Sequence, residues 1–465
     1  MVKNMRTEFD SIGSLEIPKE AYYGVQALRA KQNFQITGRR LHPQFITSLV
    51  KIKKAAAITN FEAGKLSQEI TEAIIRACDE IAEGSLREEF IVDAIQGGAG
   101  TSANMNGNEV IANRAIELLG GEKGDYTIVH PNDHVNMAQS TNDVIPTAGK
   151  LTVLTLLPGL MDELRNLEKE LNRKSIEFDS VLKMGRTQLQ DAVPMRLGQS
   201  FHAFASAIAR DIVRIKKAAK EMNTVNLGGT AIGSAINVST LYMGRIVPNL
   251  SKITGITFMQ AEDLFDATQN LDGFVTVSNA LKTCAVNLSK MCNDLRLLSS
   301  GPRTGIHEIN LPAKQNGSSI MPGKVNPVIP EVVTQVAYQV IGHDTTITMA
   351  AEAGQMELNA FEPVLFYDLF ESIDNLRGAV NTLTENCIRG ITANKEECKE
   401  HLEASVGIST ALCPYIGYKK AADIAKKSLK TGIKVKELVL KEGLLTEGEL
   451  ASILEPAHLT QPMHA

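Results

Sequence analysis

The sequence predicts a mainly α protein whose centre is a bundle of long helices. Apolar residues recur at intervals of three and four through several long segments, and this spacing places them on one face of a helix. The chain has no tryptophan and only 5% aromatic residues. Helices of this length would therefore complete their core with helices from other subunits. A chain of 465 residues is expected to form about three domains.

Four apolar stripes predict the long helices. They run from Leu157 to Leu171, from Phe201 to Ile215, from Phe274 to Leu298 and from Leu365 to Cys387. The stripe that begins at Phe274 lasts about seven turns at 3.6 residues each. A further helix is expected over residues 328–352.

The positions of these helices suggest the domain boundaries. The stretch from 1 to about 140 is broken by many glycines, and the apolar pattern shortens again after Asn394. We expect a mixed, mostly helical N-terminal domain at 1–141, the central bundle at 142–395 and a small helical domain at 396–465.

Composition argues against several classes of protein. A net charge of −5 provides no basic field for nucleic acid. No run approaches the ~18 uncharged apolar residues of a membrane helix, and Met1–Arg6 lacks the apolar part of a secretion signal, so a cytoplasmic protein is expected. The six cysteines have no CxxC spacing and the nine histidines include no HExxH pair. We therefore expect free thiols, no metal site and no other cofactor.

The segment Gly317–Pro327 reads GSSIMPGKVNP and carries unusually many polar groups. Its proline and glycine residues prevent a continuous helix, while Asn326 followed by proline is a helix-start signal. Ser318, Ser319 and Lys324 would then lie just ahead of a helix N-terminus, where free amides and the helix dipole favour negative charge. The segment is expected to bind an anion.

Three other loops have a similar design. Hydroxyl or amide side chains precede predicted helices at Gly97–Ser102, Ser140–Asp143 and Met184–Asp191. Pro146 and Pro194 are expected in the first turns of the helices that follow the second and third loops.

A single such loop is best explained as a helix cap, which uses one side-chain acceptor. Ser140–Asn142, and Ser318–Ser319 with Lys324, offer more donors than a cap uses. Four loops of this kind together favour a pocket for a small substrate with two carboxylates.

Two other kinds of site match the sequence less well. A phosphate-binding loop at Gly317–Lys324 would need four residues between its glycines, and Val325 stands where a magnesium ligand should be. A histidine-based hydrolase is disfavoured because none of the four loops contains a histidine.

At these residues the sequence resembles the aspartase/fumarase superfamily, whose shared loop reads GSSxMPxKxNP and is matched without a gap. The resemblance extends from Ala21 through Ser405 to Tyr418. It implies three largely helical domains, a homotetramer with a 20-helix core, and active sites each built from three chains. It also implies reversible anti elimination from succinyl-type substrates with release of fumarate.

The side loops resemble the branch of this superfamily that deaminates L-aspartate to fumarate and ammonia. They read GAGTS at Gly98–Ser102, QSTND at Gln139–Asp143 and GRTQLQD at Gly185–Asp191. The branch that hydrates fumarate typically carries histidine where this chain has Gln188, and uses it near a glutamate matching Glu331. Glutamine cannot titrate as an acid or base, so its expected role is hydrogen bonding.

The resemblance also implies roles for individual residues. Ser318 would abstract the Cβ proton, through an aci-carboxylate intermediate that is stabilised as charge develops. The β-carboxylate would be bound by Thr101, Ser140, Thr141 and Ser319. The α-carboxylate would be held by Lys324 and Asn326, and the departing amino group would be surrounded by Asn142, Thr187 and Gln188.

Three alternatives remain open at this point. One is hydration of fumarate to L-malate on the same scaffold. Another is elimination from a larger aspartyl derivative, such as argininosuccinate or adenylosuccinate, although those branches differ in the side loops. The third is a structural protein that keeps the fold without activity, as when superfamily members are recruited as crystallins.

Overall fold

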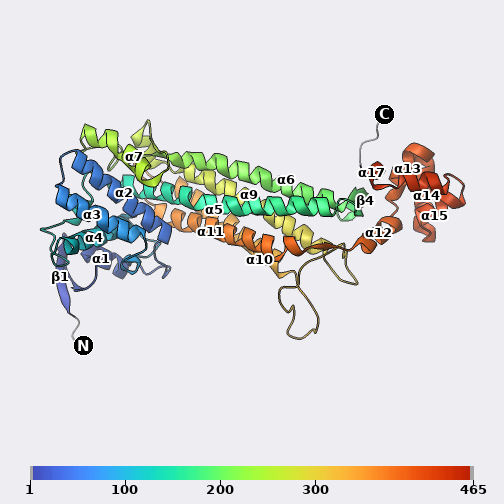
Figure 1. Cartoon of the computed structure of the whole chain (residues 1–465), viewed down its shortest axis with the longest axis horizontal. Coiled ribbons are helices and arrows are strands. Elements are labelled where there is room, and N and C mark those ends of the chain that lie inside the picture. The colour runs from blue at the N-terminus through green and yellow to red at the C-terminus, as the bar shows by residue number, and fades with distance from the viewer. Residues whose placement is uncertain (1–3, 461–465) are drawn as a thin grey trace. The chain divides into compact units, whose positions relative to one another are not determined.

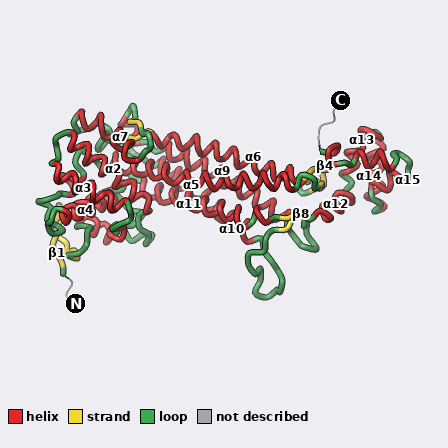
Figure 2. The backbone as a smooth tube through the Cα atoms, in the orientation of Figure 1, coloured by secondary structure: helices red, strands yellow, loops and turns green. Residues whose placement is uncertain are grey.

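A computed structural model describes residues 4–460, and most of these residues are helical. Figure 2 shows helices connected by loops, with only short strands. The prediction of a mainly α fold is confirmed. The chain divides into two compact units, 1–160 with 214–283 and 339–375, and 161–213 with 284–338 and 376–465, and each is described by itself.

The long predicted helices are all present (Figure 1). They are α5 (Thr141–Glu177), α6 (Leu197–Ala218), α9 (Asp272–Leu298), α10 (Val328–Glu352) and α11 (Glu362–Asn386). The apolar stripe of α5 is at most 1% exposed at Leu157, Leu160, Leu164, Leu167 and Leu171. Burial of these stripes is the main stabilisation of the long helices.

Side chains join the long helices within each unit. In the first unit the Phe274 ring of α9 lies 5.2 Å from the Phe366 ring of α11, and Ser278 of α9 donates to Asp344 of α10. In the second unit, Asn287 of α9 donates to Asp211 of α6. Side-by-side packing of the helices, expected from their stripes, is therefore seen in both units.

The first unit also holds the N-terminal elements. Strands β1 (Met5–Asp10) and β2 (Gly13–Pro18) pair antiparallel. The helices are α1 (Val25–Asn33), α2 (Pro43–Glu62), α3 (Gln68–Ala82), α4 (Thr101–Leu118), α7 (Thr240–Thr254) and α8 (Leu264–Gln269). Short turns of helix lie at η1 (Arg87–Glu89), η2 (Pro131–Val135) and η3 (Ala219–Asn223), and β5 (Thr224–Val225) pairs with β6 (Met259–Gln260). Helix α2 packs against both α3 and α7 (Figure 1).

The second unit contains two small sheets and the C-terminal helices. Strand β3 (Leu182–Thr187) pairs with β4 (Gln190–Arg196), and β7 (Ile309–Asn310) pairs with β8 (Thr392–Ala393). After η4 (Ile388–Gly390) come α12 (Lys395–Ala404), α13 (Ile408–Ile416), α14 (Tyr418–Thr431), α15 (Val435–Lys441), α16 (Glu447–Ile453) and α17 (Pro456–Leu459). Helices α13 to α16 share a hydrophobic core of their own.

The division into domains at 1–141, 142–395 and 396–465 stays a prediction, and residues 461–465 of the last domain lie outside the described residues. Helix α5 is long and apolar enough to cross a membrane by length and composition alone. However, 61% of its most apolar window is buried inside the protein, as in a core helix.

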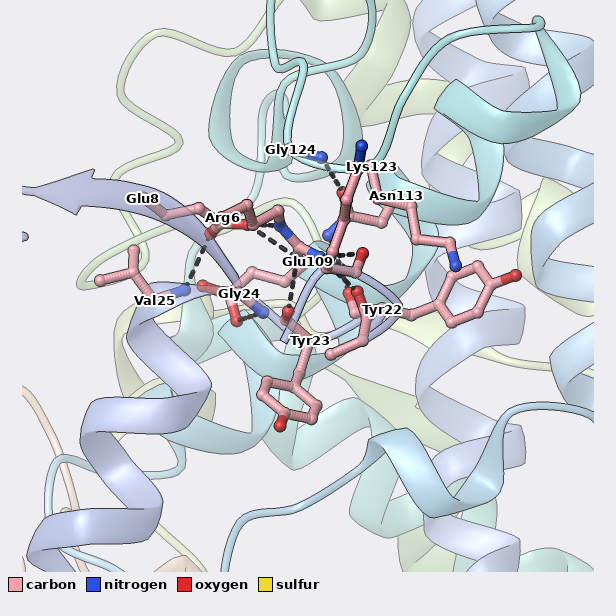
Figure 3. Close-up of polar contacts among 12 residues, drawn as sticks. Arg6, Glu8, Tyr22, Tyr23, Gly24, Val25, Glu109, Asn113, Lys123 and Gly124 are labelled. Atoms are coloured by element: carbon pink, nitrogen blue, oxygen red, sulfur yellow. Dashed lines mark hydrogen bonds and ion pairs between the residues drawn. The ribbon is translucent and has the colours of Figure 1, made fainter. Parts of the chain in front are cut away.

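The N-terminus of α1 is capped by carboxylates from outside the helix (Figure 3). Glu109 of α4 accepts hydrogen bonds from the backbone N–H groups of Gly24, Gln26 and Ala27 at 2.8, 2.8 and 3.1 Å. Glu8 of β1 accepts from the N–H of Val25 at 3.0 Å. Burial raises the pKa of Glu109 to about 8, and the three N–H groups oppose this shift. The two carboxylates join β1, α1 and α4.

We predict that Gly24→Ala destabilises the protein. A Cβ atom at this position would lie 2.7 Å from Glu109 Cδ and 2.8 Å from Glu8 Oε2, so both capping carboxylates would have to move. The free energy of unfolding should fall by about 1–3 kcal/mol, measured as a lower midpoint of urea denaturation.

The matched control is Gly244→Ala on α7, where an added Cβ meets nothing within 4 Å. This variant should be neutral or more stable, because alanine favours a helix over glycine by up to about 1 kcal/mol. Equal midpoints for the two variants would contradict the capping role of the carboxylates.

Candidate functional site

The residues predicted to form the site fall into two groups. Thr101, Ser140, Thr141 and Asn142 lie in the first unit. The second unit contains Thr187, Gln188, Ser318, Ser319, Lys324 and Asn326. Each group is described within its own unit.

In the first unit, the N-termini of α4 and α5 come together. Helix α4 begins at Thr101, directly after Gly100 in the left-handed conformation (φ 83°). Thr141, the first residue of α5, accepts a hydrogen bond from Asn104 of α4 at 3.2 Å. A Cβ on Gly100 would lie 2.9 Å from Ile145 Cγ2, so glycine permits this close approach. The loops containing Thr101 and Ser140–Asn142 are therefore neighbours, and both lead into a helix as predicted.

Asp143, which was not predicted as a site residue, joins this region to a segment distant in sequence through hydrogen bonds. Its fully buried carboxylate accepts from the N–H groups of Ser140, Gly228 and Thr230 at 2.9, 2.9 and 3.2 Å. Burial raises the pKa of Asp143 to about 6, while these N–H groups and the charge of Lys53 lower it. One carboxylate thus joins the start of α5 to the segment around residues 226–231.

The predicted position of Pro146 is wrong. It lies inside α5, which begins at Thr141, and not in the first turn. A proline at 146 cannot donate to the carbonyl of Asn142. That carbonyl instead accepts from the side chain of Asn226 at 2.9 Å, while the Asn142 amide donates to Ala231 O at 2.7 Å. The backbone carbonyl and the side-chain NH₂ group of Asn142 therefore both bond to the segment 226–231.

A second residue that was not predicted, Lys53, bonds to the chain just before the same loop. It comes from α2 and is completely buried, and its ammonium donates to Asn136 Oδ1 at 2.8 Å and Gln139 Oε1 at 3.0 Å. Burial lowers the pKa of Lys53 to about 7, and the nearby charge of Asp143 opposes this shift. In the sequence Lys53 is one of three lysines of α2, with Lys51 and Lys54, so nothing distinguished it from a lysine on a solvated helix face.

In the second unit, Thr187 and Gln188 lie at a β-hairpin. The prediction that the loop Met184–Asp191 leads directly into a helix is therefore wrong. Thr187 ends β3 and pairs with Gln190 of β4. Gln188 and Leu189 form the two-residue turn, with positive φ angles of 52° and 63°, as in a type I′ hairpin turn. Pro194 lies on β4, and α6 begins only at Leu197. The proline was mistaken for a helix-start signal because an edge strand tolerates it equally well.

The segment 317–327 forms a loop whose base is closed by hydrogen bonds. Gly317 N donates to Lys324 O at 2.8 Å, and the Asn326 amide donates to Gly317 O at 2.6 Å. Asn326 was expected to cap α10, but its side chain closes the loop instead. A Cβ on Gly317 would lie 2.5 Å from Lys324 O, so only glycine fits at this crossing.

The hydroxyl of Ser318 lies within this loop and faces backbone donors. Its Oγ accepts from the N–H groups of Ile320 at 3.2 Å and Met321 at 2.9 Å. Two donors aimed at one oxygen stabilise negative charge on that oxygen. Ser319, the next residue, and Lys324 of the same loop are exposed and therefore accessible to a ligand.

A cavity of about 790 Å³ lies beside the loop. Its wall includes Lys324, Asn326, Arg296, His307, Asn310 and Glu331. Two basic side chains, several amides and a single carboxylate in this wall suit a small anion. Among residues 4–460 no cluster of three metal-binding side chains is found. The roles of the site residues toward a substrate stay predictions.

Comparison with known proteins identifies related chains. A family model described as Lyase matches residues 13–342, and one described as Fumarase C C-terminus matches residues 408–461. The Aspartate ammonia-lyase of Bacillus sp is 53% identical over 462 residues, covering 99% of both chains. That of Escherichia coli (strain K12) is 50% identical over 467 residues, covering 100% of this chain and 98% of the relative.

Solved structures agree with these relatives. The fumarate lyase:delta crystallin from Brucella melitensis bound to cobalt superposes with a TM-score of 0.96 at 50% identity, over 98% of this chain and 100% of that one. Class II fumarase from Schistosoma mansoni gives a TM-score of 0.95 at 35% identity, over 99% and 100%. The resemblance inferred from the GSSxMPxKxNP loop is confirmed.

We predict that Asp143→Asn loosens the segments that Asp143 joins. An asparagine accepts through one oxygen only and presents an NH₂ group to the remaining N–H donors. Amide hydrogen exchange at Gly228 or Thr230 should accelerate about 10-fold or more, since hydrogen bonds to charged groups contribute about 1.5–3 kcal/mol. Mass spectrometry or NMR of the intact protein measures this.

Asp162→Asn serves as the control, because Asp162 lies on the same helix, is mostly exposed and pairs with Arg165. It should leave exchange at residues 228–230 unchanged. Unaltered exchange at both amides in the Asp143 variant would show that the carboxylate does not hold this region.

Proposed function

Because the chain belongs to the lyase family that forms the aspartase/fumarase superfamily, we propose that it catalyses the reversible deamination of L-aspartate to fumarate and ammonia. The observation that carries this proposal is full-length similarity, at 50–54% identity, to relatives named aspartate ammonia-lyase. Gln188 at the hairpin turn is compatible with deamination and cannot take part in hydration as a titrating group.

The reaction begins with transfer of a proton from the substrate Cβ to Ser318 Oγ. The electron pair of the broken C–H bond moves into the β-carboxylate and forms an aci-carboxylate. That intermediate collapses to a Cα–Cβ double bond and expels ammonia from Cα. A serine is a weak base at its ordinary pKa, so its anionic form needs stabilisation. The N–H groups of Ile320 and Met321 on Oγ support this role.

Donors around the β-carboxylate stabilise the intermediate more than the substrate, which is the condition for a faster reaction. In this proposal they are the hydroxyls of Thr101, Ser140, Thr141 and Ser319. The first three lie at or next to the N-termini of α4 and α5, where the helix dipole adds favourable potential. Lys324 and Asn326 bind the α-carboxylate, consistent with their place in the wall of the cavity.

Asn142, Thr187 and Gln188 surround the leaving amino group. Their side chains offer hydrogen bonds but no titrating acid, so ammonia departs as a neutral molecule or takes a proton from solvent. Loop 317–327 would close over the bound substrate and exclude water.

We further propose a homotetramer whose active sites each draw on three chains. Large apolar side chains remain exposed along the long helices of the single chain, including Val213 of α6, Val286 of α9, and Tyr338 and Met349 of α10. Apolar surface of this kind favours burial against other subunits.

A direct assay tests the function. Purified protein is given L-aspartate, and fumarate formation is followed by ultraviolet absorbance. In parallel, fumarate is supplied with and without ammonium, and the products are separated. Formation of aspartate only when ammonium is present supports the proposal. Formation of malate would instead indicate a fumarate hydratase, and absence of any turnover in assembled protein would indicate an inactive structural homologue.

We predict that Ser318→Ala nearly abolishes turnover of L-aspartate and leaves assembly intact. Removing a residue that acts as base costs about 10²–10⁴-fold in rate, whereas the exposed loop contributes little to the core. Steady-state kinetics and size-exclusion chromatography measure the two properties. Ser11→Ala, in the exposed turn between β1 and β2, is the matched control and should keep the full rate. A near-normal rate for the Ser318 variant would refute its assignment as the base.

A further inference from the structure

The second unit contains a buried ionic cluster that has no role in the proposed reaction. Glu308 is completely buried, and its carboxylate lies 3.0 Å from Lys183 Nζ, 2.7 Å from Arg186 Nη1 and 3.5 Å from His401 Nδ1. A buried carboxylate is tolerated only when cations and hydrogen bonds compensate for lost hydration. Moving one member away from such a cluster leaves an uncompensated buried charge. Because this is costly, the members keep fixed positions.

Three segments distant in sequence meet at Glu308. Its backbone N–H donates to Leu298 O at the end of α9 at 2.8 Å, and its carbonyl accepts from Asn394 N, just before α12, at 2.9 Å. Its side chain reaches Lys183 and Arg186, both on β3. The neighbouring residues His307 and Asn310 belong to the wall of the cavity that contains Lys324.

Arg186 directly precedes Thr187 and the turn at Gln188. Gln188 and Leu189 both have positive φ, a conformation that costs non-glycine residues about 1–2 kcal/mol each. Such backbone persists only where its surroundings hold it. The β3–β4 ladder supplies part of that restraint, and the ion pair between Arg186 and Glu308 anchors β3 one residue before Thr187.

We propose that Glu308 is a positioning residue for the amino-group side of the active site. It holds Arg186, and through it the hairpin, so that Thr187 and Gln188 stay at a fixed place relative to the Lys324 cavity wall. The carbonyl of the same residue accepts hydrogen bonds from Asn394 N and from Cys398 Sγ of α12, which makes α12 part of the support for the site. This inference rests on the proposed function, because it assigns Thr187 and Gln188 to the amino group.

The test compares ligands with and without an amino group. Glu308→Gln keeps the size of the side chain, removes its charge and turns an NH₂ group toward a cation. In the direction from fumarate to aspartate, the KM for ammonium should rise roughly 10-fold, as expected for loss of a charge-assisted hydrogen bond. Inhibition by succinate, which has both carboxylates but no amino group, should change less than about 2-fold, since that corresponds to under 0.5 kcal/mol.

A matched control and a second variant complete the design. Glu403→Gln makes the same chemical change on α12, where Glu403 pairs with Lys434 at 2.9 Å and is partly exposed, and it should alter neither constant. Arg186→Gln leaves the Glu308–Lys183 pair in place, so it tests the anchor even if the Glu308 variant does not fold. The Arg186 variant should also raise the KM for ammonium.

The double variant Glu308→Gln with Arg186→Gln should lose little more than either single variant, because both remove one shared contact. Equal weakening of ammonium and succinate, or fully additive losses, would overturn the positioning role and indicate general structural damage. A wild-type protein that forms no aspartate would instead refute the proposed function, so the two failures are distinguishable.

Discussion

The hydrogen bonds of the Asp143 carboxylate are the interaction on which the first half of the site depends. A helix leaves its first N–H groups without partners, and a long helix such as α5 could begin at several places along an apolar stripe. Asp143 accepts from Ser140 N and also from Gly228 and Thr230. The loop before α5 and a segment nearly ninety residues later are therefore fixed by one side chain.

Buried carboxyl groups have a similar role in three places. Glu109 holds the start of α1, Asp143 holds the start of α5, and Glu308 holds strand β3, which ends at Thr187. A buried carboxyl group is costly unless hydrogen bonds or cations compensate for its lost hydration, so each one favours a single arrangement of the segments around it. Among the residues proposed to contact substrate, Ser140, Thr141 and Asn142 lie beside Asp143, and Thr187 and Gln188 directly follow Arg186, the partner of Glu308.

Sequence reasoning succeeded where a residue's role depends on its near neighbours. The stripe at Leu157–Leu171 predicted α5 because the helical period alone puts its members on one face. Gly100 and Thr101 were rightly placed at a helix start. The same reasoning failed for Pro194, since proline after a polar loop fits an edge strand as well as a first helical turn. It also failed for Asn326, whose amide meets Gly317 O instead of capping α10.

The sequence by itself determined the mainly α fold, the long helices and the family, because helical periodicity and the GSSxMPxKxNP loop are local patterns. Only the tertiary structure revealed Asp143, Lys53 and Glu308 as supports of the site. Their partners are far away along the chain, and nothing in a sequence distinguishes a buried, hydrogen-bonded charge from a solvated one. The Gln188–Leu189 turn likewise required the structure, because its positive φ angles go with the pairing of β3 with β4.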